Sequence, residues 1–123
     1  MTDPIPTMSA IGLKAPNKPA DVVPFLDAYI AKKEAEITEI EEMVERYEKR
    51  RLKEERAYQA MSSFRRLLSG RKPAHHLAVE YIHYVKKPME RARKLRVEAD
   101  RARHLLDSPK SSDEKLSDLE TLT

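Results

Sequence analysis

The sequence predicts an all-α protein, an elongated antiparallel helical hairpin (a two-helix coiled coil) that assembles into an oligomer. Three observations support this prediction. Only two glycines occur among the 123 residues, which is typical of long helices. With 37% charged and 6% aromatic residues, the chain holds little material for a thick globular core. Apolar residues also recur at alternating spacings of four and three, the repeat along which paired helices pack.

Residues 1–20 are expected to form a flexible N-terminal arm. Proline removes a backbone donor and biases the preceding residue toward extended geometry, and the arm contains Pro4, Pro6, Pro16 and Pro19. It has no apolar run long enough for a signal peptide or a membrane span. We therefore expect a soluble, intracellular protein of the cytoplasm.

Residues 21–69 are expected to form the first helix. Its apolar repeat defines a seam, in which some positions are polar: Leu26, Ile30, Lys33, Ile37, Ile40, Val44, Tyr47, Arg51, Glu54, Tyr58, Met61, Arg65 and Leu68. Neither glycine nor proline falls between residues 25 and 69. Because no helix breaker interrupts the seam, we predict one continuous helix.

Residues 70–73 are expected to reverse the chain, and residues 74–107 to form the second helix. Gly70 supplies the left-handed conformation that commonly ends a helix, and a proline shortly after it suits the start of the next. The second seam consists of Ala74, Ala78, Tyr81, Val85, Pro88, Ala92, Leu95, Ala99, Ala102 and Leu106. A turn centred near residue 71 would place Tyr47 opposite Leu95.

Pro88 lies inside the predicted second helix. A proline there removes one backbone hydrogen bond, and its ring crowds the preceding turn, at a cost of about 3 kcal/mol. We therefore expect the second helix to be kinked or broken near Pro88.

Residues 108–123 are expected to form a flexible, acidic, Ser-rich tail. Ser111 and Glu114 match a capping box, which would allow a short amphipathic helix on binding. A solvated, frayed terminus is nevertheless the expected state.

The charge is distributed unevenly between the two predicted helices. Residues 21–56 hold 8 Lys or Arg against 11 Asp or Glu, whereas residues 57–107 hold 12 against 5. A basic second half favours contact with an acidic protein, or with nucleic acid through its phosphates. The candidate residues for this contact are Arg65, Arg66, Arg71, Lys72, Lys86, Lys87, Arg91 and Arg93.

Metal binding and catalysis have little support. His76, Glu80 and His83 share one helix face at a spacing used by di-iron bundles, but they point away from the seam, so they are weak metal candidates. The chain has no cysteine and no phosphate-binding loop or recognisable nucleophile. We expect no enzyme activity, no catalytic residue, no metal and no cofactor.

The function we expect is that of a non-enzymatic interaction module: an assembly factor, an adaptor or a small structural subunit. Two helices leave Tyr29, Tyr84 and Phe64 partly uncovered, so a protein partner or self-association into a dimer or higher bundle is expected to cover them. A sequence-nonspecific nucleic-acid-binding protein is the alternative. No membrane contact is expected, because the apolar stripe of the second helix is rich in alanine.

Overall fold

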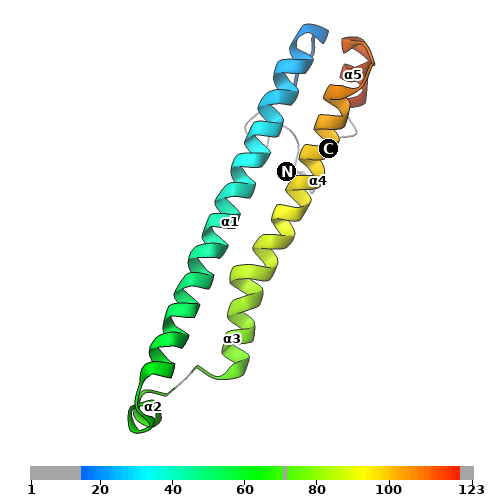
Figure 1. Ribbon diagram of the computed structural model, residues 1–123. Helices are drawn as coiled ribbons and strands as arrows, with labels where there is room; N and C mark the ends of the chain where they lie inside the picture. The colour runs from blue at the N-terminus through cyan, green and yellow to red at the C-terminus, as the bar shows by residue number, and fades with distance from the viewer. Residues whose placement is uncertain (1–14, 71, 120–123) are drawn as a thin grey trace. The chain divides into compact units, whose positions relative to one another are not determined.

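A computed structural model describes residues 15–70 and 72–119, and all of its regular elements are helical, which confirms the all-α prediction (Figure 1). The elements are a 3-10 turn η2 (Pro19–Asp21), α1 (Val22–Ala60), α2 (Ser63–Ser69), α3 (Ala74–Tyr81), a π-helical segment η3 (Ile82–Lys86), α4 (Lys87–Asp107) and α5 (Ser112–Asp118). Most of the predicted N-terminal arm, together with residue 71 and residues 120–123, lies outside the described residues. No described helix is long and apolar enough to cross a membrane.

The chain divides into two compact units. Unit 1 contains the described residues 15–37 and 94–119, and unit 2 contains residues 38–93. Each unit thus receives one part of α1 and one part of α4.

The first predicted helix is interrupted: α1 ends at Ala60 instead of continuing to residue 69. Ser62 is extended (φ −64°, ψ 156°), and its Oγ accepts a hydrogen bond of 3.3 Å from the backbone N–H of Arg65. Serine is a preferred N-cap because its side chain satisfies a donor that has no helical partner. A capping serine therefore starts a new helix, α2, where no glycine or proline marks the break.

Gly70 ends α2, as the sequence indicates, with φ +70° and ψ 165°. This combination lies outside the left-handed helical region that was predicted, in a region that essentially only glycine adopts. The N–H of Gly70 donates to the carbonyl of Arg66 at 3.1 Å. Pro73 precedes α3, whose first residue is Ala74.

Pro88 does not break the second helix, because helical structure is continuous from Ala74 to Asp107. The π-helical segment Ile82–Lys86 comes just before it, and the N–H of Lys87 donates to the carbonyl of Ile82, five residues earlier. A π turn is wider than an α turn, so it makes room for a ring that would otherwise clash with the carbonyl four residues before it. Where the sequence predicts a kink or a break, the structure shows a local change from α-helical to π-helical geometry.

Unit 1 has an apolar core to which the C-terminal segment contributes. The buried residues are Val22, Phe25, Leu26, Tyr29, Ile30, Ala102 and Leu119, with Leu105, Leu106 and Leu116 packed against them. Ser111 caps α5 by accepting a hydrogen bond of 3.3 Å from the N–H of Glu114. Residues 112–118 are therefore helical and docked on the core, in contrast to the flexible tail that was expected, because Leu116 and Leu119 find apolar surface on α1 and α4.

A polar cluster lies beside the core of unit 1. The ammonium of Lys33, a residue only 5% exposed, forms an ion pair with Glu98 and lies 5.1 Å from the centroid of the Tyr29 ring. Arg103 pairs with Glu34 nearby. Tyr29 is 2% exposed, so the expectation that its ring is left uncovered is wrong. Burial, reinforced by the negative charge of Glu98, raises the pKa of the Tyr29 phenol to about 12.

Candidate interaction surface in unit 2

The seam of unit 2 is only partly buried. Ile40, Val44 and Tyr47 of α1 are buried, as are Val85 of η3 and Ala92 of α4. The seam positions between Tyr47 and Val85 are half-buried or exposed: Arg51, Glu54, Tyr58, Met61, Arg65, Leu68, Ala74, Ala78 and Tyr81. We call Tyr58, Met61, Ala78 and Tyr81, together with Tyr84, the open seam.

Two aromatic residues of the open seam are exposed. Tyr81 is 55% exposed and Tyr84 is 44% exposed. The Tyr84 ring nevertheless stacks on the ring of buried Tyr47, with 5.0 Å between centroids and 19° between planes. One side of the Tyr84 ring is therefore packed, and much of the rest is available to a further apolar surface.

The partners of Tyr47 correct the predicted register. Tyr47 contacts Tyr84 and Glu80, about three helical turns before Leu95, the residue that a turn at residue 71 would place opposite it. The interruption at Met61 and Ser62 accounts for the difference, because α2 does not extend α1 and its residues drop out of the pairing. Tyr58 and Met61 are half-buried and Tyr81 is exposed.

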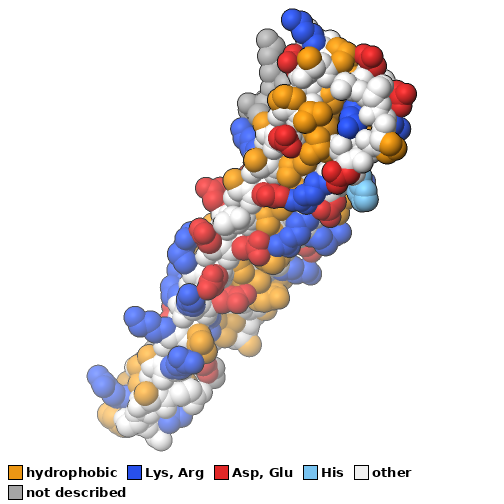
Figure 2. Space-filling model, turned by 45° about the horizontal axis from the view of Figure 1, so that its top comes forward, with side chains coloured by type: hydrophobic (Ala, Val, Ile, Leu, Met, Phe, Trp, Pro, Cys, Tyr) orange, Lys and Arg blue, Asp and Glu red, His pale blue; other side chains and the backbone are white. Residues whose placement is uncertain are grey.

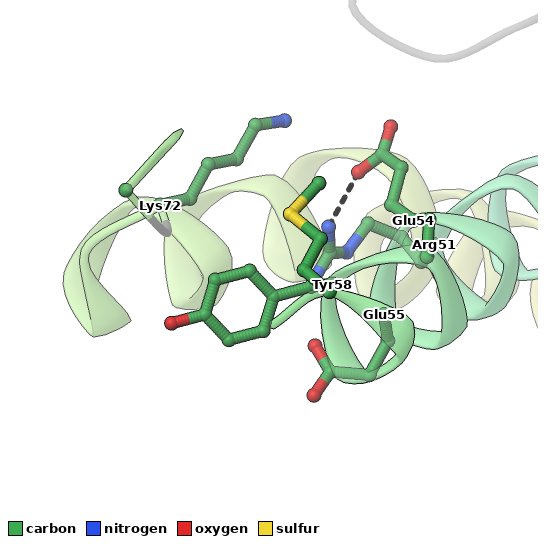
Figure 3. Close-up of a pocket in the computed structure, with 8 residues that line it drawn as sticks. Arg51, Glu54, Glu55, Tyr58 and Lys72 are labelled. Atoms are coloured by element: carbon green, nitrogen blue, oxygen red, sulfur yellow. Dashed lines mark hydrogen bonds and ion pairs between the residues drawn. The ribbon is translucent and has the colours of Figure 1, made fainter. Parts of the chain in front are cut away.

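A hollow of about 270 Å³ lies along the same part of the unit (Figure 3). Its lining comes from the last turns of α1 and from the turn that follows α2: Arg51, Glu54, Glu55, Ala57, Tyr58, Met61, Gly70 and Lys72. In its wall, the guanidinium of Arg51 forms an ion pair with the carboxylate of Glu54, with 2.6 Å between Nη1 and Oε2. With acidic and basic groups in similar number, the hollow has no charge that selects a small ligand, and it marks incomplete packing.

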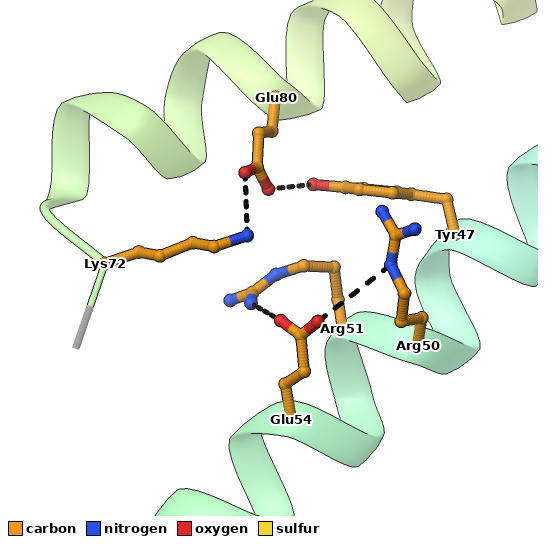
Figure 4. A network of polar contacts seen from close by, with 6 residues as sticks. All are labelled: Tyr47, Arg50, Arg51, Glu54, Lys72 and Glu80. Atoms are coloured by element: carbon orange, nitrogen blue, oxygen red, sulfur yellow. Dashed lines mark hydrogen bonds and ion pairs between the residues drawn. The ribbon is translucent and has the colours of Figure 1, made fainter. Parts of the chain in front are cut away.

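Glu80 joins α3 to α1 and to the turn (Figure 4). Its carboxylate accepts a hydrogen bond of 3.1 Å from the hydroxyl of Tyr47 and one of 2.8 Å from the ammonium of Lys72. The bond from Lys72 lowers the pKa of Glu80. Burial, together with the bond to Glu80, raises the pKa of Tyr47. Glu80 is therefore a structural acceptor that holds α3, which carries two residues of the open seam, against α1.

The predicted basic contact residues divide into two groups. Arg65 is exposed in α2, while Arg66 donates from Nε to the carbonyl of Met61 at 3.1 Å and Lys72 is held by Glu80. Arg71 lies outside the described residues. The second group is exposed at the end of η3 and the start of α4, and consists of Lys86, Lys87, Arg91 and Arg93.

The weak metal candidates are not brought together. The carboxylate of Glu80 is occupied by Tyr47 and Lys72. The ring of His76 lies edge-on to that of His75, with centroids 4.5 Å apart, and the ring of His83 lies 4.9 Å from that of Tyr84. Within the described part of the chain, no group of three His, Asp or Glu side chains is placed to hold a metal ion.

Sequence reasoning missed the two features that distinguish unit 2. These features are the break between α1 and α2 at Ser62 and the incomplete burial of the seam beyond Tyr47; the prediction was one continuous helix with Leu68 in its seam. The available signal was the pair Ser62 and Ser63 ahead of an apolar run, an N-cap pattern that marks the start of α2.

Comparison of the chain with protein-family models, with curated proteins and with solved structures finds no match.

Proposed function

We propose that this chain is a non-enzymatic helical-hairpin protein that assembles with a second copy of itself through the open seam. The hairpin is supported in unit 1 by the ion pair of Lys33 with Glu98 and in unit 2 by the bond of Tyr47 to Glu80. In each case a residue of α1 meets one that follows the turn. The proposal makes the protein an assembly factor or a small structural subunit.

The observation that carries the proposal is the exposure of residues at seam positions. Tyr81 belongs to the same helical stripe as Val85 and Ala92, which are 6% and 0% exposed, yet it is 55% exposed itself. An apolar stripe that is buried along one part and open along the next is completed when further helices pack on it, as in a four-helix bundle. The exposed rings of Tyr81 and Tyr84 suit such an interface, because aromatic side chains are enriched there.

The test is the mass of the full chain in solution, measured by light scattering during size-exclusion chromatography. Tyr81→Asp puts a charge into the open seam and should convert the oligomer to a monomer. Val79→Asp is the matched control, since Val79 is 62% exposed and lies two positions away, on the other side of α3. A wild-type chain that is monomeric at all concentrations would contradict the proposal, as would equal loss of mass in both variants.

Nucleic-acid binding is the second candidate. Residues 57–79 contain no Asp or Glu but contain Arg65, Arg66, Arg71 and Lys72, and Lys86, Lys87, Arg91 and Arg93 are exposed beyond them. Phosphate neutralisation predicts steep loss of affinity between low and moderate salt. Nucleic acid that co-elutes with the chain at low salt and is stripped at high salt would favour this candidate over self-assembly.

A further inference from the structure

The short helix α2 presents an apolar face that is left exposed by the residues that the structure describes. Phe64, Leu67 and Leu68 are 70%, 84% and 72% exposed. Their spacing of i, i+3 and i+4 puts all three on one side of the helix. Large apolar side chains are rarely left this exposed as a group on a protein that works only in water.

The same helix carries basic side chains, and acidic ones are absent from the neighbouring sequence. Arg65 and Arg66 occupy the remaining sides of α2. No Asp or Glu occurs between Glu55 and Glu80. The end of unit 2 that holds α2 shows hydrophobic and basic side chains together in the space-filling view (Figure 2). The surface therefore complements a partner that is both anionic and apolar.

The small area of this face helps to decide between a protein, nucleic acid and a lipid bilayer as its partner. A specific protein interface takes about 800 Å² from each partner, and three side chains on a seven-residue helix supply well below that area. Nucleic acid would neutralise the arginines but offers no apolar region for Leu67 and Leu68. A lipid bilayer needs no matching shape, because its interior adapts to any apolar group, and electrostatic attraction to anionic lipids adds to a small apolar contact.

We propose that α2 is a membrane-surface contact, which inserts Phe64, Leu67 and Leu68 among the headgroups and upper acyl chains of an anionic bilayer. Arg65, which is exposed, then reaches the negatively charged headgroups, as long basic side chains do at membrane interfaces. The helix lies on the bilayer and does not span it. The expectation of no membrane contact came from the alanine-rich second helix and does not concern α2.

Phe64→Trp tests insertion directly, because the chain contains no tryptophan and the new side chain is the sole indole reporter. With the full-length variant, vesicles of phosphatidylcholine and phosphatidylserine should shift its emission to the blue, and vesicles of phosphatidylcholine alone should bind at least about tenfold more weakly. Leu52→Trp is the matched control, because Leu52 is 50% exposed on α1. Its emission should stay unchanged, and a shift as large as that of Phe64→Trp would overturn the proposal.

Vesicle co-sedimentation of two double variants separates the apolar from the electrostatic contribution. The double variant Leu67→Ser, Leu68→Ser should bind the vesicles at least about tenfold more weakly than the wild-type chain. The control variant Leu52→Ser should bind them as the wild-type chain does. Arg65→Glu with Arg66→Glu should abolish the preference for phosphatidylserine. Circular dichroism checks that each variant is folded.

Three further results would overturn the proposal. One is the absence of binding of the wild-type chain to either kind of vesicle. Another is unchanged binding by Leu67→Ser with Leu68→Ser. The third is a blue shift of Phe64→Trp produced by an RNA duplex, or by raised protein concentration without lipid, when vesicles produce none. This last result would assign the face to nucleic acid or to a second copy.

Discussion

The ammonium of Lys33 in α1 forms an ion pair with the carboxylate of Glu98 in α4, although Lys33 is only 5% exposed. The pair is asymmetric, because the side chain of Glu98 is 34% exposed. Lys33 also occupies a seam position, where an apolar residue would be the usual choice. Desolvation of the lysine therefore opposes the attraction of its partner, and the two substitutions that break the pair should differ in effect.

Glu98→Gln should be more destabilising than Lys33→Met. The first leaves a buried ammonium without its counter-charge and should lower the free energy of unfolding by about 1–3 kcal/mol. The second removes the charge and keeps the packing of the stem, so it should be close to neutral. Urea unfolding of both variants measures the difference, and a larger loss for Lys33→Met would contradict this account.

The phenol of Tyr29 should titrate late. Its pKa is raised to about 12 in the folded chain, against about 10 in the unfolded chain. Between these values the folded state keeps a proton that the unfolded state has lost, so stability is retained below about pH 10 and falls as pH rises toward 12. Ultraviolet absorbance of tyrosinate follows the titration, and Tyr29→Phe should remove the step near pH 12. A profile unchanged by Tyr29→Phe would show that another phenol is responsible.

Glu80 should make stability sensitive to acid. Its pKa is lowered by the bond from Lys72, from an ordinary value of 4.5. Its contribution to stability is therefore present above that value and is lost as the pH falls through the folded pKa. Glu80→Gln should remove this part of the acid dependence, while Glu90→Gln, at an exposed position of α4, should leave it. Chemical denaturation at neutral and acid pH measures both.

Gly70→Ala should destabilise the turn between α2 and α3. A Cβ built there meets no atom within 4 Å, so the cost comes from the backbone alone. Holding alanine at φ +70° and ψ 165° costs about 1–3 kcal/mol. Ser69→Ala, one residue earlier within α2, should have little effect. The protection of amides in α2 and α3 from hydrogen exchange should fall in the glycine variant alone.

Leu119→Ala should loosen the N-terminal part of α1. Leu119 is 6% exposed and packs in the cluster that contains Val22 and Leu26. Truncation of a buried leucine costs about 2–5 kcal/mol. Faster hydrogen exchange should follow at residues 22–30, while residues 40–47 in unit 2 keep their protection. Unchanged exchange at residues 22–30 would mean that α5 does not stabilise the core of unit 1.

The sequence by itself determined the helical class and most of the buried stripe. Scarce glycine and an apolar repeat of four and three are local properties, and they hold wherever the helix packs. Helical structure accordingly runs from residue 74 to residue 107, and the seam residues from Leu26 to Tyr47 are buried. Gly70 was correctly placed at the end of a helix, although its backbone lies outside the left-handed helical region that was predicted.

Only the tertiary structure decided the pairing register of the helices, the end of α1 before Ser62 and the docking of α5. Whether a serine caps a new helix depends on a competition between continuing α1 and satisfying the backbone locally, and at Ser62 the cap prevails. That choice shifts the partner of Tyr47 from Leu95 to Tyr84 and opens the seam. The docking of α5 depends likewise on apolar surface from residues far away in sequence. Such contacts cannot be deduced from spacing, because one repeat permits several registers of similar energy.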